Sequence, residues 1–341
     1  MQQIFEEKDR KDSMKNYIKD FTKQLVEALE IGANATLKPA ADPINNVVIF
    51  GIGGSGIGGR IVTNLTRLEA IVPVATCNEY DIPTYINENT LVLVSSYSGN
   101  TEEVLSMVKQ AQTANAQIAC ITSGGELLDL AIENGYNYIK IPGGNPPRAC
   151  LGYSFTELLT YFCHYKLIDK KALNDLQSAI DLLVKDAAEI EDKAADFAKS
   201  LSGKIPVIYS SGVYEPIASR FCQQLNENSK MLCWYNKFPA LNHNEIVGWT
   251  EKNDKLAVVF FNCDEDYYRT KARQAFTKKV VSEYAGSVSE IIVKGNNAIE
   301  RSLYLVHITD WISVKIAEID NTDPIEIRVI DALKNELATL N

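Results

Sequence analysis

The sequence predicts an α/β protein with two domains of similar construction, each a parallel sheet covered by helices on both faces. Strand-like apolar runs alternate with helix-like stretches from residue 46 to residue 140, and the alternation resumes after Gly203. Alternation of this kind produces parallel strands joined by right-handed crossovers. The length of 341 residues also favours two domains of ordinary size over a single domain.

The spacing of apolar residues sets the predicted elements of the first half. Apolar positions recur at helical spacing over residues 13–37, and Pro39 and Pro43 end that helix before the first strand. The ends of the strands matter for function, because proteins with open parallel sheets bind their ligands at the carboxyl ends of the strands. We expect strands at 46–51, 72–76, 90–95, 116–122 and 137–140, and helices near 56–69, 101–114 and 125–134.

The second half repeats this pattern less regularly. Residues 152–202 have a helical pattern, and strands are then expected near 205–212, 255–261 and 288–294. We therefore predict that the second domain is a degenerate copy of the first. The predicted regions are an N-terminal helical segment (1–44), a first domain (45–152), a helical connector (153–202) and a second domain with a C-terminal helix (203–341).

The composition excludes several classes of partner. A formal net charge of −10 disfavours general attraction to nucleic acid or to anionic membranes. No apolar run approaches the roughly 20 residues that span a bilayer, and residues 1–15 lack the apolar core of a signal peptide. The seven cysteines include no CxxC pair and are typical of reduced core residues. We expect a cytoplasmic protein that binds neither nucleic acid nor membrane.

Two hydroxyl-rich loops follow predicted strands of the first half. Gly51-Ile52-Gly53-Gly54-Ser55-Gly56 follows the strand at 46–50, and Ser95-Ser96-Tyr97-Ser98-Gly99-Asn100-Thr101 follows the strand at 90–94. Each loop leads into a helix, so backbone N–H groups and the positive end of a helix dipole surround one point. Serine and threonine hydroxyls add donors without adding charge. The two loops therefore predict a phosphate site, with Ser96, Ser98 and Thr101 as donors.

Each loop also has an alternative interpretation. The spacing Gly51-x-Gly53-x-x-Gly56 matches a dinucleotide-binding fingerprint. That fingerprint expects an acidic residue at the end of the next strand, and neither Glu69 nor Glu79 is suitably placed. A glycine turn that serves packing alone is a second alternative. For the other loop the alternative is helix capping, which explains one hydroxyl but does not require three.

Three further residues are candidates for chemistry. Arg148 ends the rigid loop 143–148, where it would offer a permanent charge to substrate oxygens, unless it is an ordinary surface arginine. Glu227 and His243 would supply a base and an acid near a sugar phosphate. Their ordinary interpretations are a solvated helix residue and a hydrogen-bonded loop residue. No cluster of His, Cys, Asp and Glu has metal-ligand spacing.

Together these segments resemble a known family, the bifunctional phosphoglucose/phosphomannose isomerases. The likeness covers about residues 45–341. The hydroxyl loop is common to many sugar isomerase (SIS) proteins, including regulators, whereas the glutamate and histidine segments together are more specific. The resemblance implies two SIS-type three-layer α/β/α domains with flavodoxin-like parallel sheets. The segments that carry it are Gly53-Gly54-Ser55-Gly56, Ser96-Tyr97-Ser98-Gly99-Asn100-Thr101, Pro147-Arg148, Gln224-Leu225-Asn226-Glu227-Asn228 and Asn242-His243-Asn244-Glu245.

The resemblance also implies a reaction and a role for each residue. The reaction converts glucose 6-phosphate, and mannose 6-phosphate, to fructose 6-phosphate and back through a cis-enediol, without metal or cofactor. Glu227 is implied as the base between C2 and C1, and Arg148 as the group that stabilises the enediolate. His243, from the partner subunit of a homodimer, and Lys334 are implied in ring opening. The implied phosphate ligands are Gly54, Ser55, Ser96, Ser98 and Thr101.

One segment departs from the family. Where the family often has Asp-Pro-Thr-Pro, this chain has Asp323-Pro324-Ile325-Glu326, so glucose 6-phosphate is the more secure of the two substrates. The main alternative function is a SIS-type regulator that senses a sugar phosphate without converting it. Binding alone would need neither Glu227 nor His243. A dehydrogenase that uses the glycine turn is disfavoured because the acidic partner is missing.

Overall fold

The computed structural model describes residues 14–340, and residues 1–13 of the predicted N-terminal segment lie outside them. The chain forms two compact units. The N-terminal unit comprises residues 20–185 and 294–304. The C-terminal unit comprises the described residues up to 19, residues 186–293 and residues 305–340.

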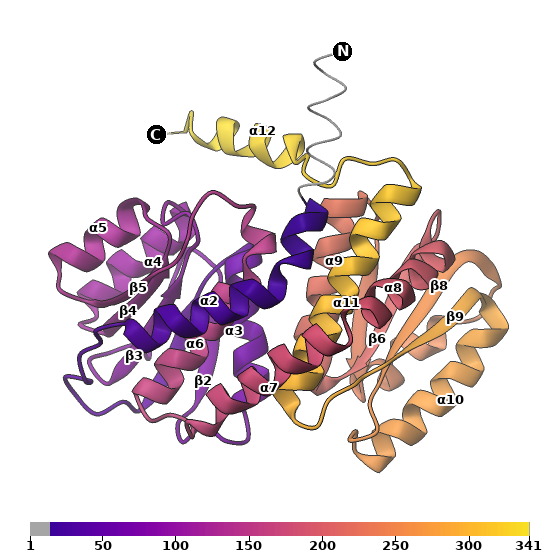
Figure 1. Cartoon of the computed structure of the whole chain (residues 1–341), viewed down its shortest axis with the longest axis horizontal. Coiled ribbons are helices and arrows are strands. Elements are labelled where there is room, and N and C mark those ends of the chain that lie inside the picture. Colours follow the sequence, from indigo (N-terminus) through magenta and orange to yellow (C-terminus); the bar gives the residue numbers. More distant parts are fainter. Residues whose placement is uncertain (1–13, 341) are drawn as a thin grey trace. The chain divides into compact units, whose positions relative to one another are not determined.

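The sheet of the N-terminal unit has five strands in the order β2-β1-β3-β4-β5, and all pairings are parallel (Figure 1). This is the flavodoxin-like order, and it confirms the predicted parallel sheet. Phe50 pairs with Val94 where β1 and β3 end, so the loops that follow these two strands start side by side. The strands are β1 (Asn46–Phe50), β2 (Val74–Cys77), β3 (Thr90–Ser95), β4 (Gln117–Thr122) and β5 (Asn137–Lys140).

Helices cover both faces of this sheet. Val48, Phe50, Val92 and Val94 pack on one face against side chains of α4 and α5. On the other face, the Tyr161 hydroxyl of α6 donates to the Cys120 carbonyl of β4 at 2.9 Å. The helices of the unit are α2 (Phe21–Asn34), α3 (Gly53–Thr66), α4 (Glu102–Thr113), α5 (Gly125–Glu133), α6 (Leu151–His164) and α7 (Lys171–Lys185).

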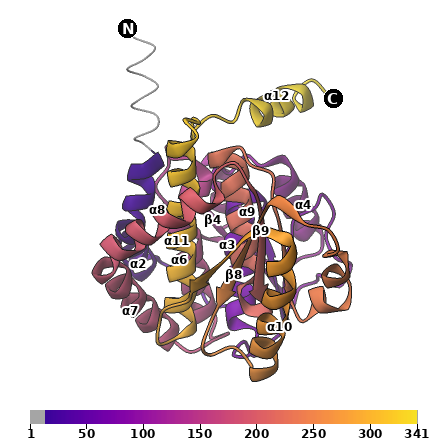
Figure 2. The same ribbon diagram turned by 90° about the vertical axis from the view of Figure 1, so that its right-hand side faces the viewer.

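The C-terminal unit has four parallel strands in the order β7-β6-β8-β9, which repeats the order of the first four strands of the other sheet. One face packs on α10 (Figure 2), and on the other Phe221 of α9 stacks on Phe261. The elements are α8 (Ala187–Leu201), β6 (Ile205–Ser211), α9 (Glu215–Ser229), β7 (Trp234–Phe238), β8 (Asn253–Asn262), α10 (Tyr268–Tyr284), β9 (Ala285–Ile292), α11 (Ala298–Ile319) and α12 (Arg328–Leu337).

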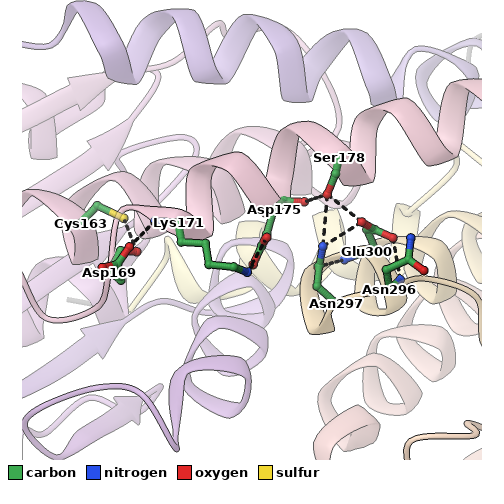
Figure 3. A network of polar contacts seen from close by, with 8 residues as sticks. All are labelled: Cys163, Asp169, Lys171, Asp175, Ser178, Asn296, Asn297 and Glu300. Carbon is green, nitrogen blue, oxygen red and sulfur yellow. Dashed lines mark hydrogen bonds and ion pairs between the residues drawn. The ribbon is translucent and has the colours of Figure 1, made fainter.

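The segment predicted as a connector consists of α6, α7 and α8. The first two belong to the N-terminal unit and α8 belongs to the C-terminal unit, while the start of α11 returns to the N-terminal unit. A polar network fixes this return (Figure 3). The Ser178 hydroxyl of α7 donates to the Glu300 carboxylate at 2.7 Å, and the Asn297 amide donates to the same carboxylate at 2.8 Å.

A carboxyl group is fully buried between α2 and α6. Glu157 of α6 has no exposed surface, and a Cβ added to Gly32 of α2 would lie 2.7 Å from one of its oxygens. Burial raises the pKa of Glu157 to about 8, and the nearby Thr160 hydroxyl offsets only part of that rise. Folding therefore favours the protonated form of this side chain.

We expect Glu157→Gln to stabilise the protein at neutral and alkaline pH. Because the folded pKa is raised from 4.5 to about 8, the wild type carries no penalty below pH 4.5 and loses stability as the pH rises through this interval. At pH 7 the gain should be about 3 kcal/mol in the free energy of unfolding. Urea unfolding at pH 4.5, 7 and 9 tests this, and a variant with the same pH profile as the wild type would refute it.

Candidate active site

The two hydroxyl loops lie next to each other at the carboxyl edge of the N-terminal sheet. They follow β1 and β3, which are paired neighbours, and they lead into α3 and α4. Ile52 precedes α3 and Thr101 precedes α4, and neither side chain caps its helix. Helix N-termini carry backbone N–H groups that lack partners within the helix. Both helix starts therefore offer donors to an anion, and capping does not account for the Thr101 hydroxyl.

The hydroxyl groups of these loops bond one another and the loop backbone. The Oγ of Ser55 accepts from the Tyr97 N–H at 3.0 Å, and that of Ser98 accepts from the Asn100 N–H at 3.2 Å. The hydroxyls of Ser96 and Thr101 lie 3.0 Å apart. Since a hydroxyl can accept and donate at once, the protons of Ser55 and Ser98 remain free to be donated elsewhere.

Two glycines are required by close backbone approach. A Cβ on Gly56 would lie 2.3 Å from the Gly51 carbonyl oxygen. Gly99 has a φ of +70°, and a Cβ there would lie 1.8 Å from the Gly124 carbonyl oxygen, so other residues would be strained. The glycine turn is therefore needed for packing, because the absence of a side chain at Gly56 lets the start of α3 approach the end of β1.

The structure brings the loop of Arg148 to the same place. Arg148 lies in the turn Pro147–Ala149 and is only 5% exposed, so the interpretation as a surface arginine is wrong. A Cβ on Gly54 would lie 3.0 Å from the Arg148 nitrogen, which places this loop against the first turn of α3. All six residues predicted to bind the phosphate or its neighbouring oxygens thus belong to one unit: Gly54, Ser55, Ser96, Ser98, Thr101 and Arg148.

Tyr97, for which the sequence predicted no role of its own, connects these parts. Its N–H donates to Ser55, its carbonyl accepts from the Ser123 hydroxyl at 2.6 Å, and its own hydroxyl accepts from the Asn145 N–H at 3.0 Å. Tyr97 therefore holds both hydroxyl loops and the arginine loop in register. The sequence signal for it was an aromatic residue within a polar loop, and the structure shows that this residue is buried.

In the C-terminal unit, a ladder of buried polar contacts fixes α9 against α11. Arg220 and Gln224 donate to the Asp310 carboxylate at 2.7 and 2.9 Å. One turn further on, the Asn228 amide donates to the Ser313 hydroxyl at 2.9 Å. Residues three and four apart share one helix face, so this ladder sets the rotation of α9 and, with it, the position of Glu227, the i+3 neighbour of Gln224.

Glu227 lines a pocket of about 290 Å³ together with residues 326–330 at the start of α12. It is half-buried. Lys230, which ends α9 in a left-handed conformation (φ +56°), donates to the carbonyls of Asp323 and Glu326 at 2.9 and 2.7 Å. The segment that departs from the family pattern therefore forms part of the wall beside the candidate base.

The structure does not bring His243 or Lys334 into this pocket. His243 is exposed at the end of the short turn Ala240–His243. The following residues are anchored, because the Glu245 carboxylate accepts from the Tyr209 hydroxyl at 2.6 Å and the Trp234 indole at 2.9 Å. Lys334 is exposed on α12, which has no buried residue.

Comparison with known proteins places the chain in a family. A bifunctional phosphoglucose/phosphomannose isomerase of Caldicellulosiruptor bescii is 37% identical over 330 residues, which cover 93% of this chain and 96% of that protein. The chain belongs to the bifunctional phosphoglucose/phosphomannose isomerase family. A second member, from Aquifex aeolicus, is 34% identical over 300 residues, covering 86% of this chain and 91% of that protein.

Two further comparisons concern the C-terminal domain and the fold. The family described as the bacterial phospho-glucose isomerase C-terminal SIS domain matches residues 190–337. Among solved structures, the C-terminal domain of glucosamine-fructose-6-phosphate aminotransferase from Francisella tularensis superposes with a TM-score of 0.72 at 14% identity, covering 92% of this chain and 98% of that one. At this identity the likeness concerns the fold, and it confirms the two-domain SIS-type α/β architecture.

Two features are absent from residues 14–340. These residues contain no group of three or more His, Cys, Asp and Glu side chains arranged to hold a metal ion. No helix in this part of the chain is long and apolar enough to cross a membrane.

We expect Asp310→Leu to destabilise the protein by about 3–5 kcal/mol, because it removes the carboxylate that pairs with the buried Arg220 guanidinium. Adding Arg220→Met should recover much of that loss, since no unpaired charge then remains. Urea unfolding of the single and double variants measures both effects, with Asp264→Leu as an exposed control. An Asp310→Leu protein as stable as the control would show that the ladder does not hold α9.

Proposed function

We propose that this chain is an aldose–ketose isomerase that interconverts glucose 6-phosphate and mannose 6-phosphate with fructose 6-phosphate. The observation that carries the proposal is the cradle at the ends of β1 and β3, where two uncapped helix starts and a set of hydroxyls offer neutral donors. Such a group suits a phosphate dianion. Membership of the isomerase family supports the same substrate class.

Glu227 is the proposed base. Isomerisation moves one proton between adjacent carbons, so a single carboxylate takes it from C2 of the aldose and returns it to C1 of the enediol. The Arg148 guanidinium stabilises the charge that develops on the enediolate oxygen. The phosphate, held by Gly54, Ser55, Ser96, Ser98 and Thr101, uses its binding energy to position the reacting carbons.

His243 and Lys334 are the proposed ring-opening groups, and a homodimer is the proposed working unit. His243 is exposed on an anchored loop and does not line the pocket of Glu227, which supports a role in the site of a second subunit. We further propose the functional division 45–152 for phosphate binding and 203–341 for catalysis. A cytoplasmic location is supported by the seven free cysteines, of which only Cys233 is not buried.

We expect Glu227→Gln to lower kcat for glucose 6-phosphate by about 10²–10⁴-fold, because the amide cannot accept the proton. KM should change little, since the phosphate cradle is untouched. The assay couples fructose 6-phosphate formation to a dehydrogenase, contains chelator, and is run in parallel on mannose 6-phosphate. Glu215→Gln on the same helix is the control. Full activity of Glu227→Gln would exclude it as the base, and a wild type that binds but never converts either sugar would favour the regulator.

Mixing two inactive proteins tests the shared site. In a heterodimer of Glu227→Gln and His243→Ala chains, one of the two sites combines an intact glutamate with an intact histidine. Random exchange should therefore restore about a quarter of the wild-type activity. Exchange is verified by mass spectrometry of the intact dimer. If exchanged dimers stay inactive while each parent is folded, His243 acts within its own chain or not at all.

A further inference from the structure

The C-terminal unit contains a second pocket, of about 420 Å³, between α10 and the loop that carries His243. Four of its lining residues form one stripe on α10, with the spacing i, i+3, i+4 and i+7. The loop contributes the other wall. The lining residues are Asn242, Ile246, Arg269, Ala272, Arg273 and Phe276.

Two positive charges in this pocket lack a carboxylate partner. No Asp or Glu side chain of residues 14–340 forms an ion pair with Arg269 or Arg273. The Nε of Arg269 donates to the hydroxyl of the neighbouring Tyr268 at 3.1 Å, and its guanidinium lies over the ring of that tyrosine. Like charges four residues apart on a helix repel each other. On a chain of net charge −10, this arginine pair is a local site of positive potential that a bound anion would relieve.

The rest of the pocket indicates more than a bare anion. The Asn242 amide donates to the Thr277 hydroxyl at 2.8 Å, while its buried carbonyl oxygen has no hydrogen-bond donor among the described residues. A ligand hydroxyl or amino group would satisfy that oxygen. Ile246 and the ring of Phe276, which is 62% exposed, provide an apolar wall. Volumes of this size suit small metabolites.

We propose that this pocket binds a phosphate monoester of a hydroxyl-bearing metabolite. Arg269 and Arg273 bind the phosphate through their paired N–H donors, which match its geometry. The Asn242 carbonyl accepts from a hydroxyl of the ligand, and the body of the ligand packs on Phe276. Because Asn242 precedes His243 directly, an occupied pocket fixes the loop that carries the proposed ring-opening group. That last consequence rests on the proposed function, whereas the binding itself does not.

Calorimetric titration with inorganic phosphate tests the site without relying on turnover. The wild type should bind two phosphates per chain, one in the cradle and one in this pocket. Arg273→Ala should weaken only the second by about tenfold or more. Lys279→Ala is the matched control, since it removes the same charge from an exposed position of α10 outside the pocket. Ser96→Ala should weaken only the first.

The variants separate this proposal from the proposed function. A wild type that binds only the Arg273-dependent phosphate, with no phosphate sensitive to Ser96→Ala, would count against the cradle. Unchanged phosphate binding in Arg273→Ala would overturn the second site. A change of oligomeric state in Arg273→Ala, seen by light scattering with its phosphate count unaltered, would assign the pocket to a contact between copies and also overturn it. Adenosine 5′-monophosphate and fructose 6-phosphate distinguish a nucleotide from a sugar phosphate. The monoester assignment fails if both bind the Arg273-dependent site more weakly than inorganic phosphate.

Discussion

The parallel pairing of β1 with β3 is the constraint on which the candidate site depends. Because Phe50 and Val94 are register partners, the turns after both strands begin at the same height, and the starts of α3 and α4 face one point. The chain order reverses between these two strands, and in open parallel sheets such a reversal leaves a crevice for ligands. Gly56 and Gly99 make the approach possible, and Tyr97 then fixes the loops to one another. Shifting either strand by one residue would separate the donors.

The candidate base is placed by a different device, a buried polar ladder. One face of α9 is occupied by hydrogen bonds to α11, which are made by Arg220, Gln224 and Asn228. Ion pairs of this kind add little net stability, because desolvation offsets their attraction. Their geometric effect is larger, since charge-assisted bonds specify one rotation of the helix. A purely apolar seam would tolerate rotation more easily, and the orientation of Glu227 would be less defined.

The sequence revealed the central strands closely and missed β7, one of the partly exposed edge strands. β1 and β3 are runs of Val, Ile and Leu that only a covered parallel strand can bury, so their limits were predicted closely. β7 is an edge strand that includes Asn236 and Lys237 and is half-exposed, so no apolar run marks it. Helix α3 begins at Gly53, three residues before the predicted start, because glycines conceal a helical turn. The ladder was visible only as polar residues on a helix, since Asp310 lies far along the chain.

The two proposed anion sites differ in the charge of their donors: the cradle uses neutral groups and the pocket on α10 uses arginines. The difference follows from their proposed roles, because a reaction takes place beside the cradle and only binding takes place in the pocket. In the cradle, hydroxyls and backbone N–H groups hold the phosphate without adding a formal charge. Arg148 is then the one predicted site residue of that unit with a full positive charge, so its field acts on the enediolate rather than being shared with a cluster of cations. At the pocket on α10 no bond is made or broken, and paired arginines are suitable there because binding strength is their only task.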